Sequence, residues 1–175
     1  MVLAIGMFAG CKNSIEDITS FTEMDDLPIE TRKEVKMYYS QNGEVAALLT
    51  APLMERYANE EEYTIMNQGI YVETYDSSMN VTSSIKADYG KNLPKSGLME
   101  AKGNVRVVNE KGEVLNTEEL FWDSKDGTIY TEKYVKITTK DEIIEGDGLI
   151  SNQDFSEYRI KKIRGIISLE DAQSN

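Results

Sequence analysis

The sequence contains no histidine, and this absence limits the chemistry open to the chain. Without histidine there is no Ser-His-Asp or Cys-His nucleophilic system, and the commonest zinc ligand is missing. A single cysteine, Cys11, excludes an intrachain disulfide. No glycine-rich loop that could cradle phosphate is present. We therefore expect a protein that is not an enzyme and that uses no cofactor and no metal ion.

Basic residues are also scarce relative to acidic ones. The net charge is −12, which argues against nucleic acid as a partner because phosphate binding needs a surplus of Lys and Arg. The acidic residues leave two site hypotheses open, a paired-carboxylate glycosidase and a calcium site. The glycosidase hypothesis has little specificity, since any two carboxylates could serve. The calcium hypothesis does not match the spacing of an EF-hand loop, and it rests on Asp123, Asp126, Asp141, Glu142, Glu145 and Asp147.

Long hydrophobic runs are absent, and the one apolar run, Met1–Gly10, is too short to span a bilayer. It is similar to the apolar region of a secretory signal, and Phe8-Ala9-Gly10-Cys11 resembles a bacterial lipobox with Cys11 as the acyl acceptor. Phe8 stands where Leu is usual, and no basic residue precedes the run. A buried free cysteine behind an N-terminal strand remains the alternative, and the true start could lie upstream.

The remainder of the chain is a series of short runs rich in Val, Ile, Tyr and Thr, separated by Gly, Asn or Asp. This pattern predicts an all-β protein of the sandwich, barrel or roll type. Asn109–Gly112 and Asp123–Gly127 are predicted hairpin turns. A helix over 45–62 is the one helical alternative, and Pro52 argues against it. Similar units recur about every 30 residues, each with a pair of small or acidic residues before an alternating run, as in stacked repeats.

Three segments carry a family resemblance: Lys102–Val107 (KGNVRV), Gly112–Leu120 (GEVLNTEEL) and Asp126–Thr131 (DGTIYT). They resemble the periplasmic domain of the LptC family of the lipopolysaccharide export system, and the repeat that this family shares with LptA and the N-terminal part of LptD. The resemblance covers about Val35 to Gly165. It implies a twisted, incompletely closed antiparallel β-jellyroll with an apolar interior groove.

The resemblance also implies a function and partners. Family members accept lipopolysaccharide from the inner-membrane ABC transporter (LptB, LptF and LptG) and pass it to an LptA-like jellyroll that joins end to end. Such a chain would work in the periplasm, anchored to the inner membrane, although anchoring to the outer membrane stays open. We divide the sequence into a signal segment with its lipobox (1–11), a polar tether (12–33), the jellyroll (34–168) and a C-terminal tail (169–175).

Alternation along the strands then gives candidate site residues. The predicted lipid-binding groove consists of inward-facing apolar side chains from successive strands: Val105, Val107, Leu120, Trp122, Ile129, Val135, Ile137, Ile144, Leu149, Tyr158 and Ile160. The predicted partner edges are the first and last strands, represented by Val35, Met37, Tyr39, Ile160 and Ile163. Two other functions stay open, a structural β-repeat lipoprotein with a solid core and a periplasmic carrier of another lipid.

Overall fold

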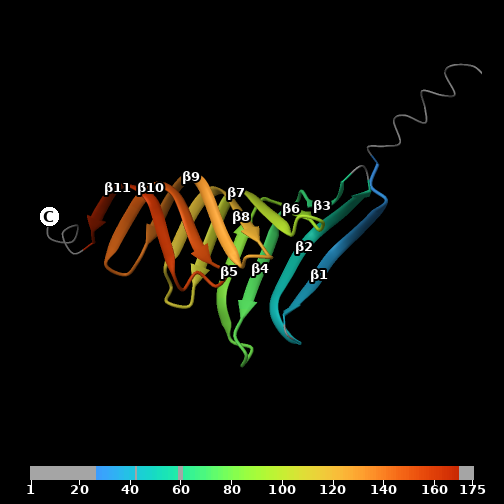
Figure 1. The fold of residues 1–175 in the computed structure, drawn as a ribbon, viewed down its shortest axis with the longest axis horizontal. Helices are drawn as coiled ribbons and strands as arrows, with labels where there is room; N and C mark the ends of the chain where they lie inside the picture. The colour runs from blue at the N-terminus through green and yellow to red at the C-terminus, as the bar shows by residue number, and fades with distance from the viewer. Residues whose placement is uncertain (1–26, 42, 59–60, 170–175) are drawn as a thin grey trace, which may run out of the picture.

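A computed structural model describes residues 27–41, 43–58 and 61–169, and these residues form one antiparallel sheet. No helix occurs among them, so none that could cross a membrane. The strands are β1 (Glu30–Gln41), β2 (Glu44–Ala58), β3 (Glu62–Met66), β4 (Ile70–Tyr75), β5 (Val81–Ala87), β6 (Tyr89–Leu93), β7 (Leu98–Asn109), β8 (Val114–Asp123), β9 (Thr128–Thr138), β10 (Glu142–Asn152) and β11 (Tyr158–Ser168). Figure 1 shows them arranged along one long axis.

The sheet is an up-and-down meander of long, bent strands. β3 and β4 both pair antiparallel to β2, one with each half of it, so together they behave as a single strand that breaks between Met66 and Ile70. β5 and β6 do the same against β7. From β7 to β11 every strand pairs with the next along the chain. Hairpin connections of this kind need only short turns, which the sequence supplies at 110–113, 124–127 and 139–141.

From β7 to β10 the strand pairing is irregular near the middle of each strand, and these irregularities occur at matching register in neighbouring strands. A bulge bends a strand and increases its twist. The aligned bends therefore fold the whole sheet along one line, which we call the spine. Its members are Glu34, Pro52, Gln68, Gly69, Asp88, Gly103, Asn104, Glu118, Glu119, Glu132, Lys133, Asp147, Gly148 and Arg164.

The fold at the spine gives the sheet two walls. One wall contains β3 and β6 and continues through the halves of β7 to β11 that lie nearest the 94–97, 124–127 and 153–157 turns. The other contains β4 and β5 and continues through the opposite halves of the same strands. The hydrophobic core draws on both walls, with Ala101 and Leu120 from the first and Val107 and Ile137 from the second. We call the interior between the walls the trough.

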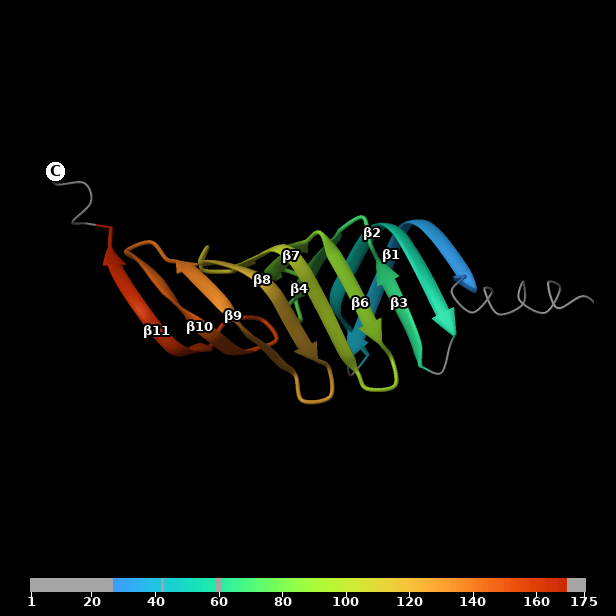
Figure 2. The ribbon, with the colours of Figure 1, turned by 90° about the horizontal axis from the view of Figure 1, so that it is seen from above.

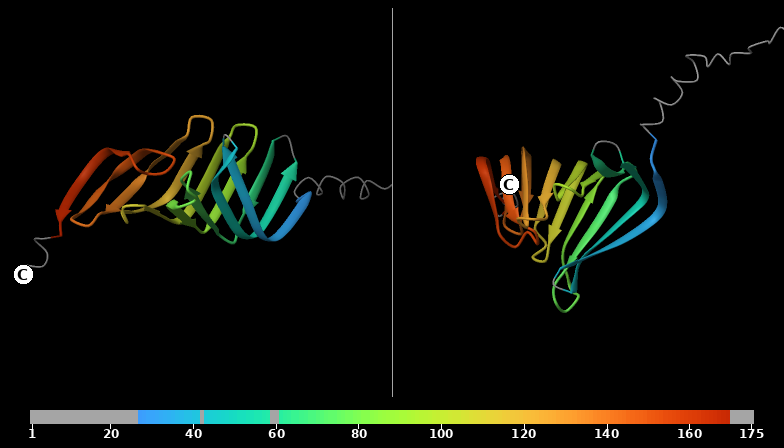
Figure 3. Two further views of the ribbon diagram at one scale, coloured as in Figure 1. Left: turned by 90° about the horizontal axis from the view of Figure 1, so that it is seen from below. Right: turned by 45° about the vertical axis from the view of Figure 1, so that its right-hand side comes forward.

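The two ends of the molecule are open strands. β1 pairs with β2, and β11 pairs with β10; in the described part of the chain neither has a second neighbour. Figures 1 and 2 place β1 and β11 at opposite ends of the long axis, and both views of Figure 3 show the same separation. The predicted fold class, an incompletely closed antiparallel β-jellyroll, is confirmed.

Two sequence expectations need comment. The helical alternative over 45–62 is wrong, because residues 44–58 form β2. Pro52 lies in β2 opposite Glu34, and both residues belong to the spine. Proline has no backbone N–H to donate, so it is tolerated at this bend of the strand. β1 begins at Glu30, before the predicted domain start at residue 34. Cys11 and the rest of the predicted signal segment lie outside the described residues.

Candidate functional site

The trough is the candidate site, and the alternation of the strands determines which side chains enter it. Seven of the residues predicted to face inward are at most 3% exposed and come from the middle strands: Val105, Val107, Leu120, Ile129, Val135, Ile137 and Leu149. Val135 and Leu149 have no exposed surface at all. These residues form one continuous apolar cluster with Leu115, Phe155 and residues of β2 and β3, among them Met54 and Met66.

The other predicted groove residues lie nearer the openings. Trp122, Tyr158 and Ile160 are half-buried and pack against the core cluster. Ile144 is half-buried and does not belong to that cluster; it pairs with Ile137 on one side and with the exposed Ile166 on the other. The trough is therefore apolar along its length and becomes more accessible toward β11.

At the β1 end, a ring from one wall reaches the other. Tyr39 of β1 contacts Trp122 of β8 edge to face, with ring centroids 5.4 Å apart. The indole Nε1 of Trp122 is buried and has no hydrogen-bond partner among the described residues. Tryptophan in a core normally finds such a partner, so this ring is held by packing alone.

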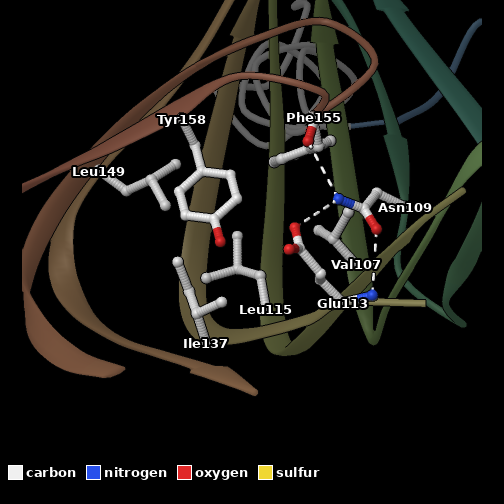
Figure 4. A pocket seen from close by; sticks show the side chains of 8 residues that line it. All are labelled: Val107, Asn109, Glu113, Leu115, Ile137, Leu149, Phe155 and Tyr158. Atoms are coloured by element: carbon white, nitrogen blue, oxygen red, sulfur yellow. Dashed lines mark hydrogen bonds between the residues drawn. The ribbon is translucent and has the colours of Figure 1, made fainter. Parts of the chain in front are cut away.

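At the β11 end, the trough is filled by a residue that the sequence did not single out. Phe155 lies in the turn between β10 and β11 and is only 3% exposed. Its ring points inward beside a cavity of about 20 Å³ (Figure 4), lined by Val107, Asn109, Glu113, Leu115, Ile137, Leu149, Phe155 and Tyr158. That volume holds roughly one water molecule. The signal in the sequence is an aromatic residue isolated in an otherwise polar turn, Asn152–Glu157.

Opposite the spine the two walls approach each other along an opening, which we call the mouth. Two polar contacts close the mouth beside Phe155. Asn109 Nδ2, at the end of β7, donates to the carbonyl oxygen of Phe155 at 3.2 Å. The hydroxyl of Tyr158 bonds the carboxylate of Glu113; burial, the charge of Glu113 and this bond together raise the pKa of Tyr158. Both contacts join a turn of one wall to a turn or strand of the other, opposite the spine.

The predicted partner edges differ in what they expose. In β1, Val35 is buried and Met37 and Tyr39 are half-buried, so their side chains face the trough and the free edge offers backbone groups. In β11, Ile160 packs against the core while Ile163 is 58% exposed. Ile166 and Ile167 are exposed as well. The last strand therefore combines an unpaired backbone with apolar side chains.

Two cations of β11 are paired across the outer surface of the sheet. Lys161 forms an ion pair with Glu132, and Arg164 Nη2 lies 2.6 Å from Asp147 Oδ1. The charges of these two side chains are thus balanced by acidic neighbours. Among residues 27–41, 43–58 and 61–169 no group of three or more Asp, Glu or Cys side chains is arranged to hold a metal ion.

Two comparisons with known proteins bear on this arrangement. The family model described as "Lipopolysaccharide-assembly, LptC-related" matches residues 4–167, which is most of the chain. Over 169 residues the chain is also 25% identical to the tip elongation aberrant protein 1 of Schizosaccharomyces pombe (strain 972 / ATCC 24843). That alignment covers 92% of this chain but only 14% of the yeast protein, so the chain spans a small part of that relative.

The family match agrees with the geometry, because a folded-over sheet with an apolar interior and two open ends is the architecture that the resemblance implies. The family's components act in the periplasm, in lipopolysaccharide export across the cell envelope from the inner membrane. The chain belongs to the LptC-related family of lipopolysaccharide-assembly proteins.

Proposed function

We propose that this chain accepts lipopolysaccharide from the inner-membrane ABC transporter (LptB, LptF and LptG) and passes it to an LptA-like jellyroll, holding the acyl chains in the trough. The observation that carries the proposal is the continuous apolar cluster between the two walls, which runs from Val35 in β1 to Ile160 in β11. Sugars and phosphates of the lipid stay outside the mouth in this arrangement, which suits the acidic surface.

Acyl chains have a large free-energy cost of exposure to water, so their transfer needs an apolar interior. Each methylene of an acyl chain costs about 0.8 kcal/mol to expose to water, so a chain of about 12 carbons costs on the order of 10 kcal/mol. Free diffusion across an aqueous compartment is therefore excluded. An apolar trough divides this cost into small steps, because each acyl chain exchanges one apolar contact for the next.

At the β11 end the walls have to move apart for an acyl chain to enter, because the cavity beside Phe155 has a volume of only about 20 Å³. The fold allows this movement without loss of strand pairing. The strand ladders run within each wall and around the spine, while the contacts across the mouth are between side chains and turns, such as Asn109 with Phe155 and Tyr39 with Trp122. Opening at the mouth thus leaves the strand pairing intact.

The open edges supply the two partner surfaces. An unpaired strand accepts an added strand from another protein through backbone hydrogen bonds. We assign β1, with Val35, Met37 and Tyr39, to the transporter side, and β11, with Ile160 and Ile163, to the next jellyroll. Cys11 would carry the lipid that anchors the chain to the inner membrane after cleavage of residues 1–10.

A second candidate function is a structural β-repeat lipoprotein, and the small volume of the cavity beside Phe155 favours it. A periplasmic carrier of another lipid would use the same trough but not the two edges.

A photo-crosslinking amino acid at Val107 or Ile137 separates these functions in cells. Both side chains are buried in the trough, whereas Arg106, the neighbour of Val107, is exposed and serves as the matched control. Lipopolysaccharide crosslinked at positions 107 and 137 but not at 106 supports the proposal. Phospholipid alone supports the other carrier. No lipid at either buried position contradicts both transport functions and leaves the structural protein.

A further inference from the structure

The β10–β11 turn holds Phe155 in place as a rigid unit. Asn152 organises the turn: its side-chain Oδ1 accepts from Glu157 N at 3.1 Å and its Nδ2 donates to Ser156 Oγ at 2.7 Å. Asp154 Oδ1 accepts from Ser156 N at 2.9 Å. Phe155 itself has φ +56°, a left-handed conformation that is unfavourable for a bulky side chain. The turn accepts this strain, and the result is that the ring is directed into the trough (Figure 4).

The side chain of Asn109, on the opposite wall, is hydrogen-bonded to this turn. Asn109 is 7% exposed. Its Oδ1 accepts from Lys111 N and Glu113 N and thereby shapes its own hairpin. Its Nδ2 faces the other way and donates to Glu113 Oε2 at 2.8 Å and to the Phe155 carbonyl at 3.2 Å. The Asn109 side chain thus shapes the turn at 110–113 of its own wall and holds the turn that contains Phe155 on the other wall.

The ring of Phe155 has the chemistry of the proposed cargo. It lines the same cavity as apolar side chains of the C-terminal part of the trough, among them Leu149 and Ile137. An acyl chain that reached these residues would need the space that the ring fills, because the remaining cavity is about 20 Å³. The ring therefore keeps this part of the trough dry and closed when no lipid is present.

We propose that Phe155 is a removable plug, clasped by Asn109, that an acyl chain displaces on its way to β11. The inference rests on the proposed function, since it assigns a gate to the same trough. It makes Phe155 the residue that determines how readily hydrocarbon enters the C-terminal part, and Asn109 the residue that sets how often the plug leaves.

The test uses dansyl-undecanoic acid as the probe and energy transfer from Trp122, the single tryptophan of the chain, as the readout. Phe155→Gly removes the ring and suits the left-handed backbone, and its affinity for the probe is expected to rise by on the order of tenfold. Asn109→Asp keeps the acceptor that shapes the hairpin but loses both donors. Its association rate is expected to rise about fivefold.

Two variants serve as matched controls. Phe121→Ala removes an aromatic ring that stacks on Tyr130 with centroids 5.4 Å apart and does not line the cavity beside Phe155. Asp123→Asn changes a turn residue that accepts from Lys125 N at 2.9 Å, as Asn109 does in its own turn. Neither control is expected to change affinity or rate. Circular dichroism establishes that each variant is folded, and Asn109→Asp decides the question if Phe155→Gly is not.

The outcomes separate the plug from the trough. If the unmodified chain takes up the probe and the Phe155 and Asn109 variants bind it with the same affinity and rate, the plug is wrong and the trough stands. If the folded variants and the unmodified chain all fail to bind, both the plug and the trough are wrong. Faster or tighter binding confined to the two plug variants supports the proposal.

Discussion

At the level of single residues, the bend of the sheet depends on two consecutive left-handed residues in β7. Gly103 has φ +73° and Asn104 has φ +47°. Asp88, at the break between β5 and β6, fastens both: its amide donates to the Gly103 carbonyl at 3.0 Å, and its Oδ2 accepts from Asn104 Nδ2 at 2.6 Å. A side chain at position 103 would approach Asp88 to 3.1 Å. Gly103 is needed both for the turn of the backbone and for this close contact.

Replacing Gly103 with Ala is expected to destabilise the protein by about 2 kcal/mol or more, from the left-handed backbone and the crowding of Asp88 together. Gly112→Ala is the matched control, since Gly112 also has φ +78° but has nothing within 4 Å of the added methyl group. It is expected to cost about 1 kcal/mol. Urea unfolding measures both values, and equal losses would mean that the contact with Asp88 contributes nothing.

On the outer surface of β4, Glu73 joins two tyrosines. Tyr71 Oη donates to Glu73 Oε1 at 3.0 Å, and Tyr75 Oη donates to Glu73 Oε2 at 2.7 Å. The hydrogen bond to Glu73, followed by burial and the carboxylate charge, raises the pKa of Tyr75 to about 12. Because the folded pKa exceeds the ordinary value of 10, the neutral phenol is favoured in the folded state.

The contribution of Tyr75 to stability is therefore complete below pH 10 and is lost as the pH rises toward 12. Glu73→Gln removes the charge and is expected to return the pKa of Tyr75 toward 10. Absorbance at the phenolate band during alkaline titration measures this change. A titration curve that Glu73→Gln leaves unaltered would show that the carboxylate does not control the phenol.

At the level of the strand, β11 differs from the rest of the sheet because apolar side chains and a free backbone edge coincide. Ile163, Ile166 and Ile167 are each more than half exposed. Exposed edges usually carry charges that discourage pairing with another chain. In β11 three cations, Lys161, Lys162 and Arg164, flank Ile163, and two of them form ion pairs with acidic side chains of β9 and β10.

Ile163→Lys is expected to weaken binding to an LptA-like jellyroll by at least about tenfold while changing the unfolding free energy by no more than about 0.5 kcal/mol. Val81→Lys is the matched control, because Val81 is a comparably exposed apolar residue on β5, at 49% against 58% for Ile163. Isothermal titration calorimetry compares the three proteins. Equal affinities would remove β11 as the joining edge.

Strand alternation made part of this architecture predictable. Val105 and Val107, or Val135 and Ile137, follow the period of two and are buried as predicted. In β8 alternation predicted Leu120 but missed Leu115 and Thr117, which are also buried, because the spine interrupts the alternation between them. That interruption depends on pairing with β9, so local pattern cannot give both sets. Phe155 was missed for a related reason, since its burial follows from contacts with the distant turn at Asn109.

For the molecule as a whole, the two walls and the spine behave as a sheet folded once along its length. Strand pairing connects β1 to β11 through one continuous sheet. The apolar residues that hold the walls together are the same residues that would contact hydrocarbon. Under the proposed function, cargo would replace a part of the protein's own core, and binding and stability would be linked.

This linkage predicts that lipopolysaccharide at about 100 times its Kd adds about 2.7 kcal/mol to the unfolding free energy. For a chain of this size, the midpoint of thermal unfolding is expected to rise by about 5–10 °C. Differential scanning calorimetry measures the shift, with deacylated lipopolysaccharide as the control. An equal shift from the deacylated molecule would mean that the sugars and phosphates, rather than the acyl chains, are bound.

The position of the unpaired strands at opposite ends has a consequence for self-association. Two copies that join β11 of one to β1 of the other still present one free β1 and one free β11, so the geometry contains no natural stop and favours open-ended filaments over closed dimers. The net charge of −12 opposes this growth, and dissolved salt weakens that opposition. We therefore expect linear association of this protein to increase with ionic strength.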